Sequence, residues 1–311
     1  MRRVIISASR RTDIPAYYSN WFYNIIQEGS VLIRNPFNRR QIYAIDLSPD
    51  KVLGIVFWTK NPLPMLARLD ELRDYKYYFQ FTITPYGKDI EPNIPDKKDV
   101  IIPAFKRLSE KIGADRVIWR YDPILINSRY SVDYHLRAFE KIAFELRAHT
   151  RRVTISFIDT KYRGVKSNAK ALALSRFSFD EQLGLSAKLA GIARRYGLAI
   201  DACAEPIVLR EAGIERSRCV DDRLLEKLVG RPLSLSKDRN QRADCGCVES
   251  VDIGMYNTCP NMCRYCYANY NPKLVAENHG IHDPQAPLIS GVPREHDEIR
   301  ERKTSRRQTQ S

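Results

Sequence analysis

Short runs of β-branched and aromatic residues alternate along the chain with longer segments of helical periodicity, and this rhythm limits the possible folds. The runs typical of strands are 4–9, 52–59, 77–84, 117–121, 153–158 and 198–204. The helical segments are 15–28, 63–74, 98–113, 132–149 and 180–196, and Ser178 with Glu181 forms a capping box before the last. Parallel strands need long crossover connections. The sequence therefore predicts an α/β fold built on a mainly parallel (β/α) barrel or partial barrel.

Two further strand-like pieces, SVLIRN and QIYAIDL, are joined by PFNRR and predict an inserted hairpin. The residues after 292 are polar and charged, and we expect them to be loosely ordered or helical. The predicted organisation is a barrel-like core at 1–206, a cysteine-containing insertion at 207–250, the last strand, cluster loop and following helix at 251–292, and a polar tail at 293–311.

Charged residues follow several of the predicted strands. In parallel α/β sheets ligands bind beyond the carboxyl ends of the strands, and guanidinium groups bind carboxylates and phosphates in bidentate fashion. The candidate cofactor-binding residues at these ends are Arg10, Arg11, Lys60, Arg120 and Glu205. The alternative for each is a loop or capping residue that is satisfied within the fold. The sequence identifies no catalytic residue.

The formal net charge is +14, from 51 lysines and arginines against 37 aspartates and glutamates. A positive field concentrates anions, so we expect an anionic substrate, with nucleic acid as one candidate partner. Because the basic residues are scattered along the whole chain, a well-solvated surface is the alternative interpretation. No apolar run reaches the roughly 18 residues of a membrane span, and the apolar stretch near the N-terminus is too short for a secretory signal. We expect a cytoplasmic protein without a membrane anchor.

Seven cysteines are present, and five of them lie between residues 245 and 266. The odd count and the lack of an export signal favour metal ligation over disulfides. Cys259, Cys263 and Cys266 have the spacing Cys-x3-Cys-x2-Cys. Structural zinc normally takes four protein ligands, whereas a cubane held by three cysteines keeps one iron free for another molecule. The spacing favours a [4Fe–4S] cluster, although Cys245 or Cys247 could supply a fourth thiolate to zinc.

The other four cysteines make a complete tetrathiolate set if the chain between them folds back on itself. They are Cys203, Cys219, Cys245 and Cys247. Such a set suits an auxiliary iron–sulfur cluster or a structural zinc ion. The alternative is that Cys203 is a small buried hydrophobic residue, as free cysteines often are. Tyr265 stands directly before the last cysteine of the first motif, and we expect its ring to shield the cluster on one side.

The cysteine spacing, with an aromatic residue before its last cysteine, resembles the cluster motif of the radical S-adenosylmethionine (SAM) superfamily. Nearly the whole chain also resembles the bacterial family described as domain of unknown function 1848, in the segments SASRRTDIPA, FWTKNP, CGC and DIGMYNTCPNMCRYCYAN. The first resemblance implies a [4Fe–4S] cluster whose unique iron chelates SAM, and a 5′-deoxyadenosyl radical that abstracts a hydrogen atom from the substrate. It also implies an electron donor such as flavodoxin or ferredoxin.

The sequence departs from the superfamily pattern in the position of the cluster loop. The loop usually follows the first barrel strand, whereas here it follows the last predicted strand, VDIGMYN. This order implies a TIM-barrel-like fold that is circularly permuted, in which VDIGMYN lies beside the N-terminal strand VIISAS. No glycine-rich segment of the kind that contacts the methionine amino group is found, so the SAM contacts are unassigned.

Two other functions remain open at this point. The first is a zinc-stabilised nucleic-acid-binding protein without catalysis, which the net charge and the tetrathiolate set would suit. The second is an iron–sulfur protein for electron transfer or redox sensing without a SAM site, which would not need so large a barrel with a polar rim.

Overall fold

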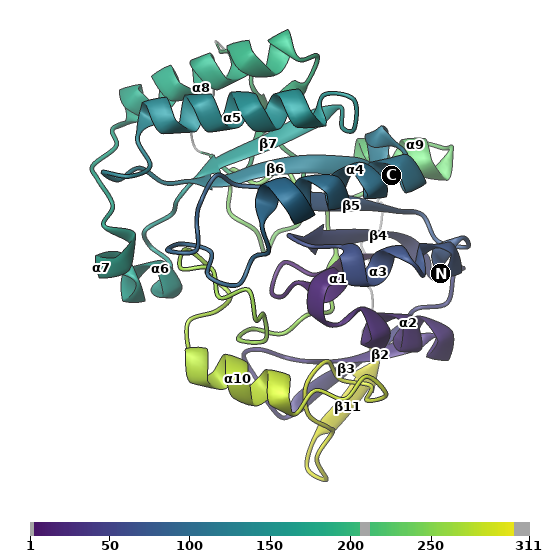
Figure 1. The fold of residues 1–311 in the computed structure, drawn as a ribbon. Coiled ribbons are helices and arrows are strands. Elements are labelled where there is room, and N and C mark those ends of the chain that lie inside the picture. The colour runs from purple at the N-terminus through teal and green to yellow at the C-terminus, as the bar shows by residue number, and fades with distance from the viewer. Residues whose placement is uncertain (1–2, 206–211, 302–311) are drawn as a thin grey trace.

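The computed structural model describes residues 3–205 and 212–301. At its centre is a sheet of eight strands in the order β10-β1-β4-β5-β6-β7-β8-β9, and every neighbouring pair is parallel (Figure 1). The strands are β1 (Val4–Ala8), β4 (Val52–Thr59), β5 (Tyr77–Thr82), β6 (Val117–Ile124), β7 (Arg152–Phe157), β8 (Ala199–Ala202), β9 (Glu215–Arg216) and β10 (Val251–Asp252). The α/β fold with a parallel sheet is confirmed, and the sheet is consistent with a partial barrel.

The N-terminal strand pairs with the strand that precedes the cysteine loop. Ile6 lies opposite Val251 and Ser7 opposite Asp252, in parallel register. The predicted neighbourhood of VIISAS and VDIGMYN is therefore confirmed. Because carboxyl ends of parallel strands meet at one edge, this pairing places the loop after β10 beside the residues that follow β1.

Helices occupy most of the connections between the strands. They are α1 (Ile14–Tyr17), α2 (Ser19–Glu28), α3 (Leu63–Leu66), α4 (Ile102–Ile112), α5 (Val132–Leu146), α6 (Arg163–Ser167), α7 (Ala169–Leu172), α8 (Phe179–Arg195), α9 (Asp222–Val229) and α10 (Pro272–Gly280). Short 3-10 helices span Leu69–Leu72 and Ala114–Arg116, and a π-helical turn spans Lys97–Ile101. The capping box of Ser178 and Glu181 is confirmed at the start of α8. The predicted helix at 15–28 is divided at Tyr18, whose φ of −130° is not helical.

The two faces of the sheet are buried by different parts of the chain. Successive strand residues point to opposite faces. Phe57 and Phe79 belong to the large core on the face covered by α4, α5 and α8, which Figure 1 shows along one side of the sheet. Their neighbours Val56 and Tyr78 pack on the other face, in a core that includes Leu225 of α9 and three cysteines of the segment 219–248. The segment predicted as an insertion thus covers one face of the sheet.

A separate sheet has the order β11-β3-β2. β2 (Ser30–Arg34) and β3 (Gln41–Asp46) form the predicted hairpin, and β11 (Glu298–Glu301) pairs with β3 in parallel. The expectation of a loosely ordered or helical tail is wrong for β11, because the open edge of β3 offers main-chain partners and Arg34 binds Asp297 at 2.8 Å. The remaining tail residues, 302–311, lie outside the described part of the chain. Within residues 3–205 and 212–301, no helix has the length and apolar character to cross a membrane.

Candidate functional site

The loop after β10 carries three cysteines and is closed by asparagine side chains. Asn257 has a φ of +55°, a conformation that asparagine tolerates better than most residues. Its main-chain N–H donates to the carbonyl of Ala268, and its side-chain oxygen accepts the N–H groups of Tyr270 and Asn271. Asn269 Nδ2 donates to the carbonyl of Cys259 at 2.5 Å. These bonds join the start and end of the loop, so its three thiols are held in one compact segment.

Burial raises the pKa of all three thiols, although main-chain N–H donors at Cys259 and Cys266 act against it. Main-chain N–H groups donate to the sulfur of Cys259, from Asn261 and Asp13, and to that of Cys266, from the two residues at 268 and 269. Burial raises the pKa of the Cys259 thiol to about 12 and that of Cys263 well above its ordinary value. N–H donors to sulfur are a feature of iron–sulfur ligands, because they offset charge on the metal-bound thiolates.

Three thiols can hold a cluster that leaves one iron open, or join a fourth ligand around zinc. Within the described residues, no three histidine, cysteine, aspartate or glutamate side chains are already arranged to hold one metal ion. Each cysteine of a cubane binds a different iron, so the thiols of a cluster do not have to converge on one point. Cys263 is nonetheless close enough to interact electrostatically with both Cys259 and Cys266.

A cavity of about 390 Å³ borders Cys263. Its lining includes Arg264 and Asn269, and each has a buried polar atom, Nε and Oδ1 respectively, without a hydrogen-bond partner. Buried polar atoms are nearly always hydrogen-bonded, to protein or to a bound molecule. Ligand pockets commonly range from roughly 300 to 1,000 Å³. The cavity therefore has the size and the unsatisfied groups of a ligand site beside a cysteine of the loop.

A buried carboxylate, Glu91, organises the cations next to the loop. Its Oε1 accepts Lys60 Nζ at 2.7 Å and the hydroxyl of Tyr265, and its Oε2 contacts Lys97 Nζ at 2.5 Å. Burial acts to raise the pKa of Glu91, but the two lysines outweigh it and hold the pKa at about 2. The pKa of Lys60 is raised although burial opposes it, because Glu91 and Cys263 favour its charged form. A fixed positive charge therefore lies beside the thiol of Cys263.

Tyr265 is fixed by the same carboxylate. Besides its hydroxyl bond to Glu91, its ring lies 5.5 Å from the Lys60 ammonium and 5.9 Å from the ring of Tyr86. Its predicted role in shielding a cluster stays a prediction.

Asp13 connects three segments at the edge of the sheet. Its buried carboxylate accepts the Thr59 hydroxyl at 2.7 Å, the Lys60 N–H at 2.7 Å and the Asn261 amide at 3.1 Å. Burial raises the pKa of Asp13 to about 6. Asp13 thereby ties the residues after β1 and β4 to the cysteine loop.

The five predicted strand-end residues separate into different surroundings. Lys60 lies beside Cys263, as described above. Arg10 and Arg120 both lie over the ring of Trp58, at 5.3 and 5.2 Å, and Arg120 Nη1 donates to Cys219 Sγ at 2.9 Å. These two arginines therefore face the second cysteine set and not the first.

The other two strand-end candidates bind groups of the protein. Arg11 lies over the Tyr256 ring at 5.0 Å and 3.9 Å from Asp252. Glu205 accepts the N–H of Phe157 at 2.8 Å, and burial raises its pKa to about 7.

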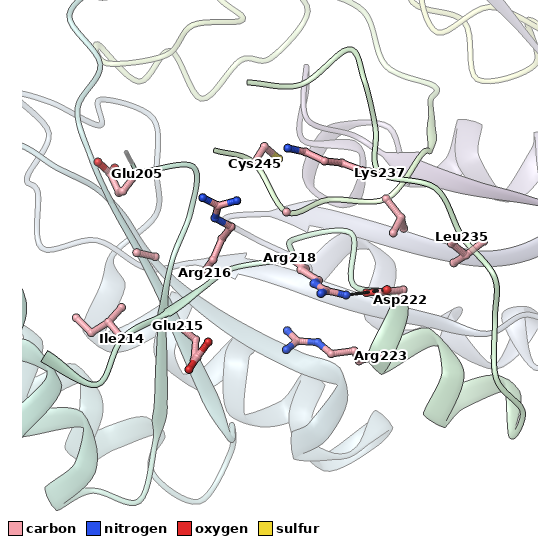
Figure 2. Close-up of a pocket in the computed structure, with 13 residues that line it drawn as sticks. Glu205, Ile214, Glu215, Arg216, Arg218, Asp222, Arg223, Leu235, Lys237 and Cys245 are labelled. Carbon is pink, nitrogen blue, oxygen red and sulfur yellow. Dashed lines mark hydrogen bonds and ion pairs between the residues drawn. The ribbon is translucent and has the colours of Figure 1, made fainter. Parts of the chain in front are cut away.

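A larger cavity, of about 680 Å³, lies at the β8 and β9 end of the sheet. Its basic lining residues are Arg216, Arg218, Arg223 and Lys237. Figure 2 shows Glu205 and Cys245 on its upper rim and the ion pair of Arg218 with Asp222 below. Cys245 of the second cysteine set is thus part of its wall.

Several functional neighbours were missed by sequence reasoning. Glu91 lies in an irregular connection after β5, and Lys97 begins the short π-helical turn that follows, so neither residue is marked by a periodic signal. Asp252 accepts the hydroxyls of Ser7 at 2.8 Å and Ser9 at 2.6 Å. A signal for Asp252 existed, because a carboxylate inside an apolar strand run is costly to bury without partners.

Comparisons with known proteins give a family and no activity. A family model with the description "Domain of unknown function (DUF1848)" matches residues 5–268. No curated protein matches the chain.

Solved structures show only weak likenesses. A Bacteroides thetaiotaomicron protein that carries the description alpha-L-fucosidase matches at 12% identity over 55% of this chain and 76% of its own, with a TM-score of 0.29. Pyruvate carboxylase T882A of Rhizobium etli, with the allosteric activator acetyl coenzyme-A, matches at 13% identity over 72% of this chain and 21% of its own, TM-score 0.29. The carboxyl transferase domain of that enzyme, with pyruvate, matches at 13% identity over 74% of this chain and 46% of its own, with a TM-score of 0.23. TM-scores this low assign neither fold nor activity to this chain.

Proposed function

Because the chain belongs to the family described as Domain of unknown function (DUF1848), whose description names no activity, we propose from the site itself that it is a radical SAM enzyme with an anionic or nucleic-acid-related substrate. Three thiols on one loop, two of them buried and that of Cys266 half-buried, carry this proposal together with the ligand-sized cavity beside Cys263. Cys259, Cys263 and Cys266 would hold a [4Fe–4S] cluster. With SAM bound, such a cluster supplies reductive cleavage of SAM and abstraction of a hydrogen atom from the substrate.

The chain's own residues would position and protect the bound groups. Asp13 holds the loop against the ends of β1 and β4 through its bonds to Lys60 and Asn261. Glu91 fixes the Lys60 ammonium beside Cys263, where its positive charge offsets the negative charge of metal-bound thiolates. The burial of the loop cysteines keeps water from the site.

The cavity beside Cys263 offers groups that complement an α-amino acid. Asn269 Oδ1 is an acceptor without a partner, which suits an ammonium group, and Arg264 Nε is a donor without a partner, which suits a carboxylate; both atoms are covered by protein, so binding would include a turn of these side chains toward the cavity. SAM presents an amino and a carboxylate group together. We therefore assign these two residues to the methionine end of SAM, where sequence reasoning left the contacts open.

The substrate would bind next to SAM beside Cys263, because the radical must contact the hydrogen atom that it abstracts, and the 680 Å³ cavity, which shares no lining residue with that site, would take a second ligand. The formal net charge of +14 favours an anionic substrate. The lining of the 680 Å³ cavity is mixed in charge, because its arginines pair with aspartates and Glu205 lies on its rim with a pKa raised to about 7. Radical SAM chemistry needs one electron for each SAM cleaved, so we propose a flavodoxin or ferredoxin as donor.

Anaerobic reconstitution with iron and sulfide tests the proposal. We expect brown protein with about four iron atoms per chain in the first site, which forms 5′-deoxyadenosine when SAM and dithionite are added. Cys263→Ala should abolish both iron binding at this site and 5′-deoxyadenosine. Gly184→Ala is the control, because Gly184 lies in open space on α8, outside both cysteine sets and both cavities, and the variant should keep iron and SAM cleavage. Wild-type protein that binds iron and never cleaves SAM, or that stays colourless, contradicts the proposal.

A further inference from the structure

Four thiols outside the cluster loop meet on the second face of the sheet. The sulfurs of Cys203 and Cys219 are 3.2 Å apart. Cys247 is close enough to Cys219 and to Cys245 to act on the pKa of both thiols. Three of the four belong to the buried core under α9, and Cys203 packs against it. Residues distant in the sequence have thus been brought into one group of sulfurs.

The backbone around this group is built for close approach. A Cβ added to Gly246 would lie 2.7 Å from the carbonyl oxygen of Ser217, so only glycine lets the turn between Cys245 and Cys247 rest on the segment before Cys219. The N–H of Val248 donates to the carbonyl of Val220 at 3.2 Å. The two cysteine-bearing segments are therefore held together by main-chain contacts that do not involve the sulfur atoms.

Hydrogen-bond donors point at the sulfurs. Arg120 is 5% exposed, and its Nη1 donates to Cys219 Sγ at 2.9 Å. The N–H of Val220 donates to Cys247 Sγ at 3.4 Å. Arg10 Nη2 is buried without a hydrogen-bond partner, and the negative groups that act on this guanidinium include Cys247 and Cys219. Buried guanidinium groups need anions, and a neutral thiol is only a weak acceptor.

Asp122 and Asp238 already pair with these arginines, Asp122 with Arg120 and Asp238 with Arg10 at 3.9 Å. The pairs satisfy the net charges of the arginines, but they leave Arg10 Nη2 without an acceptor. A metal-bound thiolate is an acceptor of the required charge, because it keeps much of its negative charge after binding.

The distance between the sulfurs helps to distinguish a disulfide, a cubane cluster and a tetrahedral zinc site. A disulfide needs sulfurs about 2.05 Å apart, and Cys203 and Cys219 are not at that distance. Each thiol of a cubane binds its own iron, which separates the sulfurs. Tetrahedral zinc with Zn–S bonds of about 2.3 Å brings every pair of sulfurs to roughly 3.8 Å, in contact with one another. The close pair of Cys203 and Cys219 favours one ion over a cubane.

We propose that Cys203, Cys219, Cys245 and Cys247 bind one zinc ion as a tetrathiolate site that is independent of the three-cysteine loop. In the described residues Cys203 and Cys219 are in contact and Cys247 lies near Cys219 and Cys245, but the four sulfurs do not form a closed shell. Zinc binding therefore includes rotation of cysteine side chains about fixed backbones. The ion would fasten the segment 212–248 to the sheet. It would thereby set the wall of the 680 Å³ cavity, to which Cys245 and Gly246 belong.

The test uses the full chain with its first site removed, as the variant Cys259→Ala/Cys263→Ala/Cys266→Ala. We expect this protein to retain about one zinc ion per chain, counted by mass spectrometry after exhaustive dialysis, and to give intense thiolate-to-cobalt absorption when cobalt replaces zinc. Adding Cys219→Ser and Cys247→Ser should reduce the zinc to near zero. Ser217→Ala is the matched control, since it alters a neighbour of Cys219 without removing a thiol.

Zinc absent from the triple variant, a brown cluster with sulfide in its place, or a Cys203–Cys219 disulfide found by mass spectrometry would overturn the zinc site. If the triple variant does not fold, the zinc X-ray absorption edge of wild-type protein decides instead, with four sulfur neighbours expected and mixed nitrogen or oxygen ligands contradicting the site. Neither measurement depends on SAM cleavage, so failure of the zinc site and failure of the proposed function can be told apart.

Discussion

The substitution Glu91→Gln tests whether the buried carboxylate holds the cations beside the cysteine loop. Glutamine keeps the shape and an acceptor oxygen but removes the charge that pairs Lys60 and Lys97. A folded-state pKa near 2, against an ordinary 4.5, corresponds to about 3 kcal/mol of folding stability. Removal of one partner from a buried ion pair costs about 3–5 kcal/mol by direct measurement. We therefore expect the free energy of unfolding at pH 7 to fall by about 3 kcal/mol.

The pH dependence of this stability difference is a second test of the role of Glu91. A lowered folded-state pKa contributes stability that is complete above the unfolded-state pKa, near 4.5, and is lost as the pH falls toward 2. The difference between wild type and Glu91→Gln should therefore be largest at pH 7 and shrink between about pH 4.5 and 2. Urea denaturation followed by circular dichroism, on protein purified without reconstitution, measures both quantities.

Glu71→Gln is the matched control for this experiment. Glu71 also accepts from a cation, Arg68 Nε at 2.6 Å, but the pair lies on the surface. Exposed pairs contribute about 0–1 kcal/mol, so the control should change stability by less than about 1 kcal/mol. Equal stabilities of Glu91→Gln and wild type at pH 7, or a difference that does not shrink in acid, would refute the role assigned to Glu91.

Three further predictions concern the loop and the large cavity. Gly164→Ala would place a Cβ 2.2 Å from the carbonyl oxygen of Cys266, so the iron content after reconstitution should fall several-fold. Gly184→Ala, in open space on α8, should keep the full iron content and raise the free energy of unfolding by about 0.5–1 kcal/mol. Equal iron contents of the two variants would contradict this packing. Tyr265→Phe removes a hydrogen bond to a buried carboxylate and should lower the free energy of unfolding by about 1.5–3 kcal/mol in urea denaturation; an unchanged value would contradict the bond. Burial raises the pKa of Glu205 to about 7, so the free energy of unfolding of the wild type should fall as the pH rises from about 4.5 to 7. Glu205→Gln should remove this decline. The same pH dependence of stability in the variant and the wild type would contradict the prediction.

Much of the fold followed from local pattern. The β-branched runs became β1 and β4 to β8 nearly as predicted, because two-sided burial in a parallel sheet needs continuous apolar segments. The hairpin of β2 and β3 was predicted from its own residues. β9 and β11 were missed, since Glu215–Arg216 and Glu298–Glu301 carry no apolar pattern and become strands only because a partner edge is open beside them.

The sequence by itself determined which residue types could hold metal, because cysteine spacing and residue chemistry are local properties. The position of the cysteine loop beside the first strand was expected from the resemblance to a permuted barrel, whose first and last strands are neighbours, and the pairing of β1 with β10 confirms it. Only the tertiary structure decided which strand-end cation meets which thiol. Lys60 lies beside Cys263, whereas Arg120 donates a hydrogen bond to Cys219. Side-chain partners across parallel strands depend on register and on the face to which each residue points, and a one-residue change would reverse that face.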